Sequence, residues 1–173
     1  MTDIPLYEKA IVFAAIAHKD QKRWSGDPYI THTVRVAGRA ELITLNTIAL
    51  KNNPVGFAVF DFETVKIAAI LHDIIEDCNI SEETLRKEFG EEVANVVQLV
   101  TRDEKDSYID FIRKIISIDD RIHFLAAIVK LADLRDNTSD LKPDSPLWNR
   151  YKPAISMISL YLNRICPNFV NPS

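Results

Sequence analysis

Apolar residues along this chain recur three and four positions apart, which is the spacing of one face of an α-helix. The first stripe lies within residues 6–17, and a polar segment with a glycine and a proline follows it at residues 21–28. A second helix is expected from about residue 30 into the forties. Residues 46–60 break the pattern, because they contain an Asn-Asn-Pro run and a glycine.

The second half of the chain repeats the helical spacing and adds residues that cap helices. Residues 65–71 are almost all apolar, which predicts a helix buried on most of its sides. Ser81, the acidic pair at residues 119–120 and Ser145-Pro146 are typical of helix starts. The helices expected here cover residues 82–89, about 93–100, 108–118, about 121 to beyond 133, and a terminal stretch that starts near 145 or at Pro153. We therefore expect an all-α protein.

The length and composition favour one domain. With 173 residues, of which 47% are hydrophobic and 27% charged, the chain is long enough for one sizeable core and short for two. We interpret residues 1–173 as a single domain. The motifs discussed below lie within about residues 6–140, and residues 145–166 form a helical extension.

The charge and the cysteines exclude several classes of protein. A formal net charge of −4 argues against a general nucleic-acid binder, because affinity for the phosphate backbone needs a basic surface. Cys78 and Cys166 are far apart, which favours neither a disulfide framework nor a thiolate zinc site. The longest apolar run, residues 10–17, is too short to cross a bilayer, and the amino terminus does not have a signal-peptide pattern. We expect a cytoplasmic protein without a membrane partner, and the oligomeric state stays open.

Four side chains suit a divalent metal ion. His32, His72, Asp73 and Asp133 offer two imidazoles and two carboxylates, which leave coordination positions for water and a phosphate oxygen. This donor set suits Mn²⁺ or Fe²⁺ better than a closed structural zinc. Asp73 and Asp133 both follow apolar helical stretches, where an unpaired charge would cost on the order of several kcal/mol. Such acids need a cation.

A second layer of polar residues lies one helical turn beyond three of these candidates. Residues four apart share a helix face, so Glu76, Asp77 and Asn137 are expected above His72, Asp73 and Asp133, respectively. A carboxylate there can orient a water molecule and take its proton, while an amide can donate a hydrogen bond without changing the charge. The pattern predicts metal-assisted hydrolysis of a phosphate compound.

Simpler interpretations stay open for some of these residues. Taken alone, His32 is equally well explained as a metal ligand or as a histidine at a helix start. His18 and His123 are interpreted as surface residues or as partly buried residues whose hydrogen bonds are satisfied. Lys22 and Arg23 are either solvated charges in a loop or phosphate contacts. A helical protein without any site would carry no stoichiometric transition metal.

The motifs around these residues resemble those of the HD-domain metallohydrolases, in particular the hydrolase domain of RelA/SpoT-type enzymes and the stand-alone small alarmone hydrolases. Residues 23–32 read RWSGDPYITH and are similar to the family's R-x-S-G-E-P-Y-I-x-H signature. Residues 69–77 read AILHDIIED and are similar to its A-L-L-H-D-x-x-E-D. Further agreement comes from Phe89-Gly90 with Val93, from Val100-Thr101, and from the run 130–133 with Asn137.

The resemblance implies an all-helical bundle, a Mn²⁺ ion, and removal of the 3′-pyrophosphate from guanosine tetra- or pentaphosphate to give GDP or GTP and pyrophosphate. By position in the motifs, the metal ligands would be His32, His72, Asp73 and Asp133. Glu76 and Asp77 would handle the attacking water, and Arg23, Ser25 and Asn137 would contact the nucleotide. The chain has no room for the synthetase domain of the longer enzymes, so only breakdown is implied.

Three departures from the family pattern suggest alternatives. Trp24 stands where the family often has a basic residue, the interval between the two histidines is longer, and the run after Asp133 differs. A second hypothesis therefore keeps the metal site and changes the substrate to another nucleotide or phosphorylated metabolite. A third is a nucleotide-sensing helical module without turnover, which the intact Glu76 and Asp77 argue against.

Overall fold

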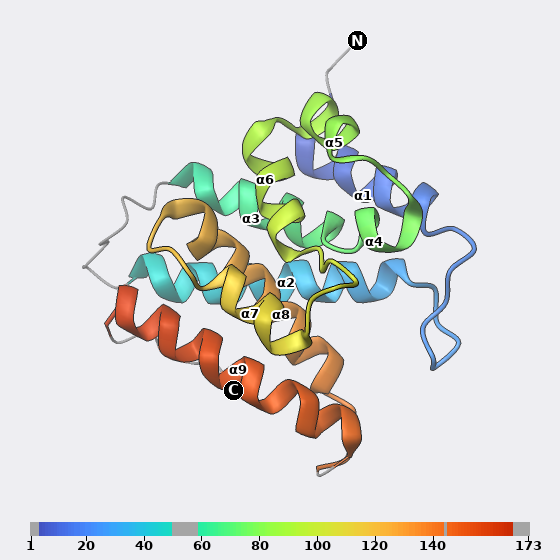
Figure 1. Ribbon diagram of the computed structural model, residues 1–173. Helices are drawn as coiled ribbons and strands as arrows, with labels where there is room; N and C mark the ends of the chain where they lie inside the picture. Colours follow the sequence, from blue (N-terminus) through green and yellow to red (C-terminus); the bar gives the residue numbers. More distant parts are fainter. Residues whose placement is uncertain (1–3, 50–58, 144, 168–173) are drawn as a thin grey trace.

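The computed structural model describes residues 4–49, 59–143 and 145–167, and these residues form nine α-helices (Figure 1). The helices are α1 (Leu6–Ala17), α2 (Ile30–Ala49), α3 (Val59–Leu71), α4 (Ile74–Cys78), α5 (Glu82–Phe89), α6 (Glu91–Val100), α7 (Tyr108–Ile115), α8 (Arg121–Thr138) and α9 (Pro146–Ile165). In this part of the chain, β-type pairing is limited to an isolated bridge between Lys22 and Pro28. The predicted all-α class is confirmed.

Capping residues set three of the helix starts that the sequence predicts. Ser81, Ser145 and Asp120 each accept a hydrogen bond from the backbone amide three residues further on, at the starts of α5, α9 and α8. Asp119, the other member of the acidic pair, instead accepts two hydrogen bonds from Arg164 on α9. The predicted bounds of α5, residues 82–89, agree with the structure.

Three predicted boundaries are wrong by a few residues. The helix α2 continues to Ala49 and α3 begins at Val59, so residues 46–49 and 59–60 of the predicted break belong to helices. Residues 50–58 of the break lie outside the described residues. The helix α7 ends at Ile115 and not at Ile118. The carbonyl oxygen of Ile118 accepts a hydrogen bond from the Tyr161 hydroxyl on α9 at 2.8 Å, a tertiary contact that helical spacing does not reveal.

The helix that delivers the His-Asp pair is also interrupted. It ends at Leu71, and α4 begins at Ile74, so His72 and Asp73 lie in a turn between two helices. The prediction that Glu76 and Asp77 continue the same helix above them is therefore wrong. The backbone nevertheless keeps one helical bond across the turn, because the amide of Asp77 donates to the carbonyl of Asp73 at 2.8 Å.

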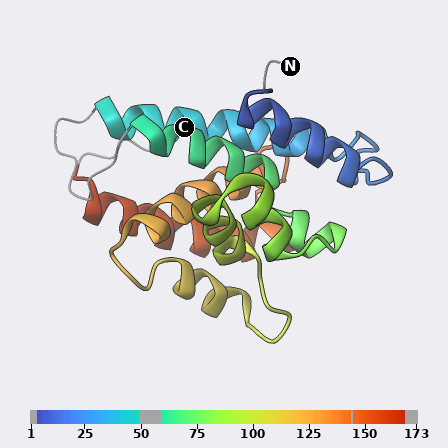
Figure 2. The same ribbon diagram turned by 90° about the horizontal axis from the view of Figure 1, so that it is seen from above.

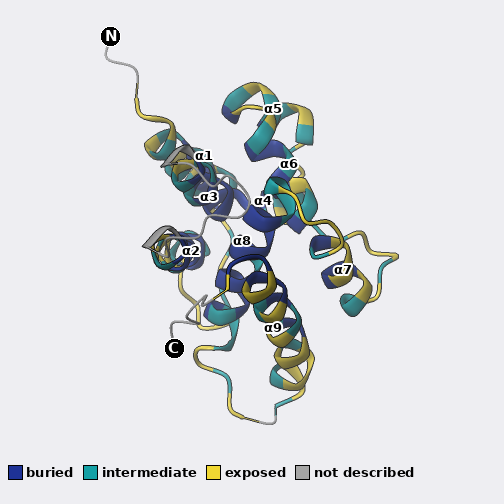
Figure 3. Cartoon of the chain, turned by 90° about the vertical axis from the view of Figure 1, so that its left-hand side faces the viewer, coloured by how far each residue is buried: buried dark blue, intermediate teal, exposed yellow. Residues whose placement is uncertain are grey.

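The helix α8 lies at the centre of the molecule and packs against α2, α3, α6, α7 and α9. Residues 124–129 are all buried, and six consecutive residues cannot belong to one face of a helix. Figure 3 shows α8 surrounded by other helices, while the outer faces of α5 and α9 are exposed. None of the helices in the described part of the chain is long and apolar enough to cross a membrane.

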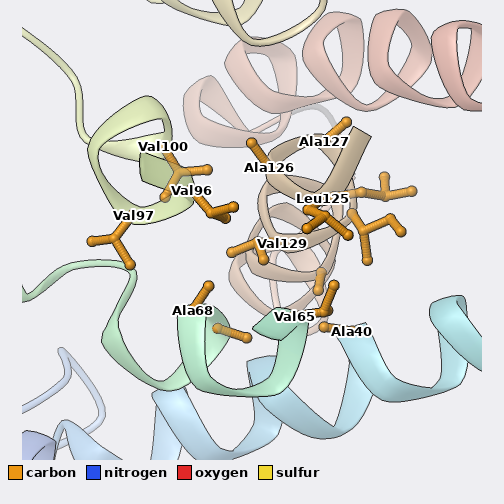
Figure 4. Close-up of a cluster of buried hydrophobic side chains, with 14 of the residues drawn as sticks. Ala40, Val65, Ala68, Val96, Val97, Val100, Leu125, Ala126, Ala127 and Val129 are labelled. Carbon is orange, nitrogen blue, oxygen red and sulfur yellow. The ribbon is translucent and has the colours of Figure 1, made fainter. Parts of the chain in front are cut away.

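Small side chains let these helices approach closely. Figure 4 shows Ala40 of α2, Ala68 of α3 and Ala126 of α8 within one cluster of buried apolar residues that also contains valines of α6. Figure 2 shows α1, α2 and α3 side by side, with α8 and α9 on one side of them. This packing brings the start of α2, the end of α3 and the second half of α8 together.

The polar segment before α2 folds as a tight hairpin. The amide of Arg23 donates to the carbonyl of Asp27 at 2.9 Å, and the amide of Tyr29 donates to the carbonyl of Gln21 at 3.0 Å. Gly26 has a φ of +91° at the tip, a conformation that glycine adopts without strain. The hairpin thus places Arg23 and Tyr29 beside the first turn of α2, which contains His32.

Candidate metal centre

Two buried histidines turn the same ring nitrogen toward one point. His32 comes from the first turn of α2, and its Nδ1 lies 2.8 Å from Asp136 Oδ2. His72 comes from the turn after α3, and its Nδ1 lies 2.9 Å from the carbonyl oxygen of Ala69. A carbonyl oxygen and an ionised carboxylate only accept hydrogen bonds, so both Nδ1 atoms carry a proton. Whenever the ring is neutral, the Nε2 atom of each histidine offers a lone pair.

Asp133 of α8 turns a carboxylate oxygen toward the same point. Its Oδ1 lies 3.4 Å from His32 Nε2 and 3.6 Å from His72 Nε2. One ligand atom from each of these three buried residues lies within 4.8 Å of the other two. Two neighbours hold the carboxylate in place, since Lys130 Nζ donates to Oδ2 at 2.7 Å and Asn137 Nδ2 donates to Oδ1 at 2.5 Å. We call His32, His72 and Asp133 the metal trio.

Asp73 adjoins the metal trio from the turn between α3 and α4. Its Oδ2 lies 2.8 Å from His72 Nε2 and 3.7 Å from His32 Nε2. The hydroxyl of Tyr29 donates a hydrogen bond to the same oxygen at 2.5 Å. Asp73 is thus a close neighbour of the trio, and its predicted role as a fourth ligand stays a prediction.

The metal trio passes a test of fit for a divalent ion. Both Nε2 atoms are fully buried, and neither makes a hydrogen bond to any described residue, although carboxylates lie near. Buried polar atoms are normally hydrogen-bonded, so two buried Nε2 atoms that face carboxylates call for a positive charge between them, either a proton or a metal ion. Two imidazoles and a carboxylate are a common donor set for a divalent metal.

Without an ion, the charges of these residues balance one another. Burial alone would lower the pKa of His72, but the Asp73 and Asp133 carboxylates outweigh it and raise the pKa to about 10. Burial would raise the pKa of Asp73, but the His72 charge brings it down to about 2. Similarly, Lys130 holds the pKa of the buried Asp133 carboxyl well below its usual range. A metal ion would therefore replace a proton on His72.

A cavity of about 300 Å³ opens beside the metal trio, and Asp73 and Asp133 form part of its wall. Among the described residues, four cationic side chains reach it from four parts of the chain: Arg23, Arg102, Lys130 and Arg150. Its aromatic lining consists of Tyr29, Tyr108, Phe111 and Tyr151. A concave site with several arginines beside a metal-binding group suits a ligand that carries phosphates.

A family model described as the HD domain matches residues 10–146 of this chain. The chain belongs to the HD-domain family. The match ends at the start of α9, so most of the last helix lies beyond it. The resemblance that the motifs at residues 23–32 and 69–77 predict is confirmed.

Curated relatives of this HD domain are several times longer than the chain. A guanosine-3′,5′-bis(diphosphate) 3′-pyrophosphohydrolase of Haemophilus influenzae is 35% identical over 143 residues, which are 77% of this chain and 19% of that protein. The protein of the same name from Vibrio cholerae is 34% identical over 152 residues, 82% of this chain and 19% of the relative. The bifunctional (p)ppGpp synthase/hydrolase SpoT of Escherichia coli is 34% identical over 149 residues, which are 79% of this chain and 18% of SpoT. The matched region thus spans about a fifth of these relatives.

A solved structure shares the fold of this HD domain over almost its whole length. It is described as a metazoan ortholog of SpoT that hydrolyzes ppGpp and plays a role in starvation responses. The TM-score is 0.67 at 23% sequence identity, and the match covers 98% of this chain and 92% of the other. The similarity confirms the helical-bundle fold, including the region of α9.

The HD domain brings most of the predicted site residues together. Glu76, Asp77, Arg23 and Asn137 all line the cavity together with the two aspartates described above. The guanidinium of Arg23 donates to Asn137 Oδ1 at 2.9 Å, a contact between the hairpin and α8. Ser25 is not among the lining residues, and its hydroxyl donates to Asp27 at 2.9 Å in the exposed hairpin. Its predicted contact with substrate stays a prediction.

Several residues of the site carry no role in the sequence interpretation. Lys130 could have been found, because a lysine three residues before a buried aspartate on the same helix is a natural charge partner. Tyr29 lies inside a quoted motif, but nothing in the spacing shows that its hydroxyl reaches Asp73. Arg102 and Arg150 come from segments distant in sequence, and only the packing of the helices brings them to the cavity.

Proposed function

We propose that this HD domain is a metal-dependent pyrophosphohydrolase that removes the 3′-pyrophosphate from guanosine 3′,5′-bisdiphosphate or its pentaphosphate analogue, giving GDP or GTP and pyrophosphate. One observation carries the proposal: His32 Nε2, His72 Nε2 and an Asp133 oxygen converge beside a cavity lined by four cationic side chains. Relatives that align with about four fifths of this chain bear the name of this activity.

The metal trio is the proposed binding group for a divalent ion, with Asp73 as a fourth donor. Nitrogen and oxygen donors that leave several coordination positions open suit Mn²⁺, which is the ion we propose. When bound, the ion would lower the pKa of water and neutralise charge on the phosphorus. Lys130 and Asn137 hold Asp133, so the carboxylate is oriented before any ion arrives.

Glu76 and Asp77 are the proposed acceptors of the proton from the attacking water. Both are exposed to the cavity, and a hydrogen bond from Gln21 Nε2 to Asp77 Oδ2 at 2.8 Å fixes one of them. In the proposed reaction the water oxygen bonds to the phosphorus attached to the ribose 3′ oxygen. The bond between that phosphorus and the 3′ oxygen breaks, a carboxylate takes the water proton, and the leaving 3′ oxygen becomes a hydroxyl by taking up a proton from that carboxylate or from solvent.

The cations of the cavity provide the proposed grip on the two diphosphates. Arg23 donates a hydrogen bond to Asn137, and Lys130 donates one to Asp133, so both cations lie on the side of the cavity that α8 forms. Arg102 and Arg150 line the same cavity from the segment after α6 and from α9. Arginines on several sides of a small cavity neutralise a polyanion whose charge the acidic chain as a whole would repel.

In two of the departures from the family pattern, the residues that differ do not line the cavity. Trp24 is 73% exposed and does not line it. In the run after Asp133, only Asn137 lines the cavity, while Asp136 is buried against His32. These two differences therefore give no structural reason to expect another substrate.

A release assay tests the proposal directly. Metal-free protein is loaded separately with Mn²⁺, Zn²⁺ and Mg²⁺ and incubated with a panel of guanosine and adenosine polyphosphates. We expect Mn²⁺-dependent release of pyrophosphate from guanosine 3′,5′-bisdiphosphate. Release from a different member of the panel would favour the second hypothesis, and binding of the nucleotide without any release would favour a sensing module.

A further inference from the structure

Asp136 of α8 is a buried carboxylate that three basic side chains of α2 surround. It is 1% exposed, and it does not line the cavity. Its Oδ2 lies 2.8 Å from His32 Nδ1. Arg35 donates to both oxygens, from Nε at 2.9 Å and from Nη2 at 3.0 Å, and Arg39 donates from Nε at 3.3 Å.

The two imidazoles of the metal trio therefore have different supports. His72 is held by a neutral carbonyl, whereas His32 is held by a charged carboxylate. A carboxylate that accepts the proton of one ring nitrogen fixes the orientation of the ring and makes the opposite nitrogen a stronger electron donor. That opposite nitrogen is His32 Nε2, which faces Asp133 Oδ1 at 3.4 Å.

The spacing along the two helices explains how one imidazole contacts two carboxylates. Asp133 and Asp136 are three residues apart on α8, and His32 lies between them, with one nitrogen toward each. Arg35 follows His32 by three residues on α2 and binds Asp136 through two parallel hydrogen bonds, which fix the plane of the carboxylate. The sequence departs from the family pattern at this run, and here it places a carboxylate behind a metal-trio histidine.

We propose that Asp136 is a positioning residue for metal binding: it fixes the orientation of His32 and strengthens Nε2 as a ligand, and Arg35 orients Asp136. The inference rests on the metal site of the proposed function, but it does not depend on which nucleotide is hydrolysed. A purely structural role, in which Asp136 only ties α2 to α8, is the competing explanation.

Metal affinity separates the two explanations. We compare Asp136→Asn with Asp61→Asn by titration of metal-free protein with Mn²⁺ and by thermal unfolding. Asp61 is the matched control, because it is a buried carboxylate that also ties two helices through an arginine, Arg121 of α8. We expect both variants to lose thermal stability, and only Asp136→Asn to bind Mn²⁺ more weakly, by about 10- to 100-fold.

A second variant keeps the carboxylate and removes its support. Arg35→Gln should retain the fold, since the Arg35 side chain is 48% exposed, and should weaken Mn²⁺ binding by a smaller factor than Asp136→Asn does. If both Asp136→Asn and Arg35→Gln bind Mn²⁺ as the wild type does, or if the wild type binds no divalent ion, the inference is overturned. Wild-type protein that binds Mn²⁺ but releases no pyrophosphate would instead reject the proposed function alone.

Discussion

The Tyr29 hydroxyl donates a hydrogen bond to Asp73 Oδ2 at 2.5 Å, and this contact joins the hairpin before α2 to the turn after α3. Burial and the charge of Asp73 raise the pKa of Tyr29 far above its usual value, so the phenol stays protonated and remains a donor. The same oxygen of Asp73 lies 2.8 Å from His72 Nε2. Tyr29 thus sets the direction in which Asp73 faces the metal trio.

Replacing Tyr29 by Phe should weaken metal binding with little change of shape. The variant loses one charge-assisted hydrogen bond, and a supporting residue of a metal ligand typically contributes about tenfold or more to affinity. Titration with Mn²⁺ measures the effect. Tyr161→Phe is the matched control, because it removes a tyrosine hydrogen bond to Ile118 that has no part in the site. Equal Mn²⁺ affinities of the wild type, Tyr29→Phe and Tyr161→Phe would exclude Asp73 as a ligand that Tyr29 orients.

The raised pKa of His72 predicts that metal binding releases a proton. The folded, metal-free protein has a His72 pKa of about 10, against about 6.5 in an unfolded chain. The stability that this group contributes is fully present below about pH 6.5 and is lost as the pH rises through about 10. A metal requires the neutral ring, so between these values its affinity should increase with pH, by up to about tenfold per unit.

Calorimetric titration measures this proton directly. Metal-free protein is titrated with Mn²⁺ at about pH 7.5 in two buffers with different ionisation enthalpies, and the difference in heat gives the number of protons released. We expect about one proton per ion from His72. Binding without proton release would contradict the ionised state of His72 or its place among the ligands.

Much of the fold could be predicted from the sequence, because helical spacing shows where the helices lie and local capping signals mark several of their starts. Ser81 and Ser145 cap α5 and α9 as their positions predict. The interruption between α3 and α4 escapes the same reasoning, because the spacing of polar residues continues across the turn. Asp77 even keeps its helical hydrogen bond to Asp73, so the pattern cannot distinguish one helix from two.

The metal trio was easier to predict than the cavity beside it. His72 and Asp133 stand out because polar groups at the ends of apolar helices need partners. Arg150 carries no such local signal, and it reaches the cavity only because α9 packs on α8 and α7. Asp136 has no predicted role in the sequence, whereas the packing of α8 on α2 buries it against His32. Tertiary packing decides these roles.

Replacing Glu76 by Gln should separate binding from turnover. The amide keeps the size of the side chain and cannot accept the water proton, so kcat should fall by about 10²- to 10⁴-fold while Mn²⁺ affinity and nucleotide binding persist. Asp77→Asn, measured in parallel, shows which of the two carboxylates contributes more to the transfer of the water proton. Full activity in both variants would remove them from the proposed proton transfer.

Arg23 should contribute to substrate affinity and not to metal binding. Its guanidinium lines the cavity and donates a hydrogen bond to Asn137 at 2.9 Å. Asn137 in turn donates to Asp133, so Arg23 does not contact the metal trio directly. Arg23→Ala should raise KM by about tenfold, which corresponds to about 1.4 kcal/mol, with unchanged Mn²⁺ affinity. Lys22→Ala is the control, because Lys22 is the neighbouring cation of the hairpin and does not line the cavity. Equal KM values for the two variants would argue against a specific phosphate contact by Arg23.

Lys130 and a divalent ion should both stabilise the Asp133 carboxylate, so a variant without the lysine should gain more stability from the ion than the wild type does. Lys130 is 12% exposed and bonded to a carboxylate that is 4% exposed, so Lys130→Met removes the nearest cation from a buried charge. The metal-free variant should lose on the order of 3–5 kcal/mol of stability, and Mn²⁺ should restore a large part of it. Thermal unfolding with and without Mn²⁺ should therefore show a larger metal-induced shift of the melting temperature in Lys130→Met than in the wild type.

Lys66→Met is the control for this prediction. It removes the partner of Glu41, which lies away from the metal trio, and it should show the wild-type shift. A Lys130→Met protein that Mn²⁺ does not stabilise more than the wild type would contradict metal binding at Asp133.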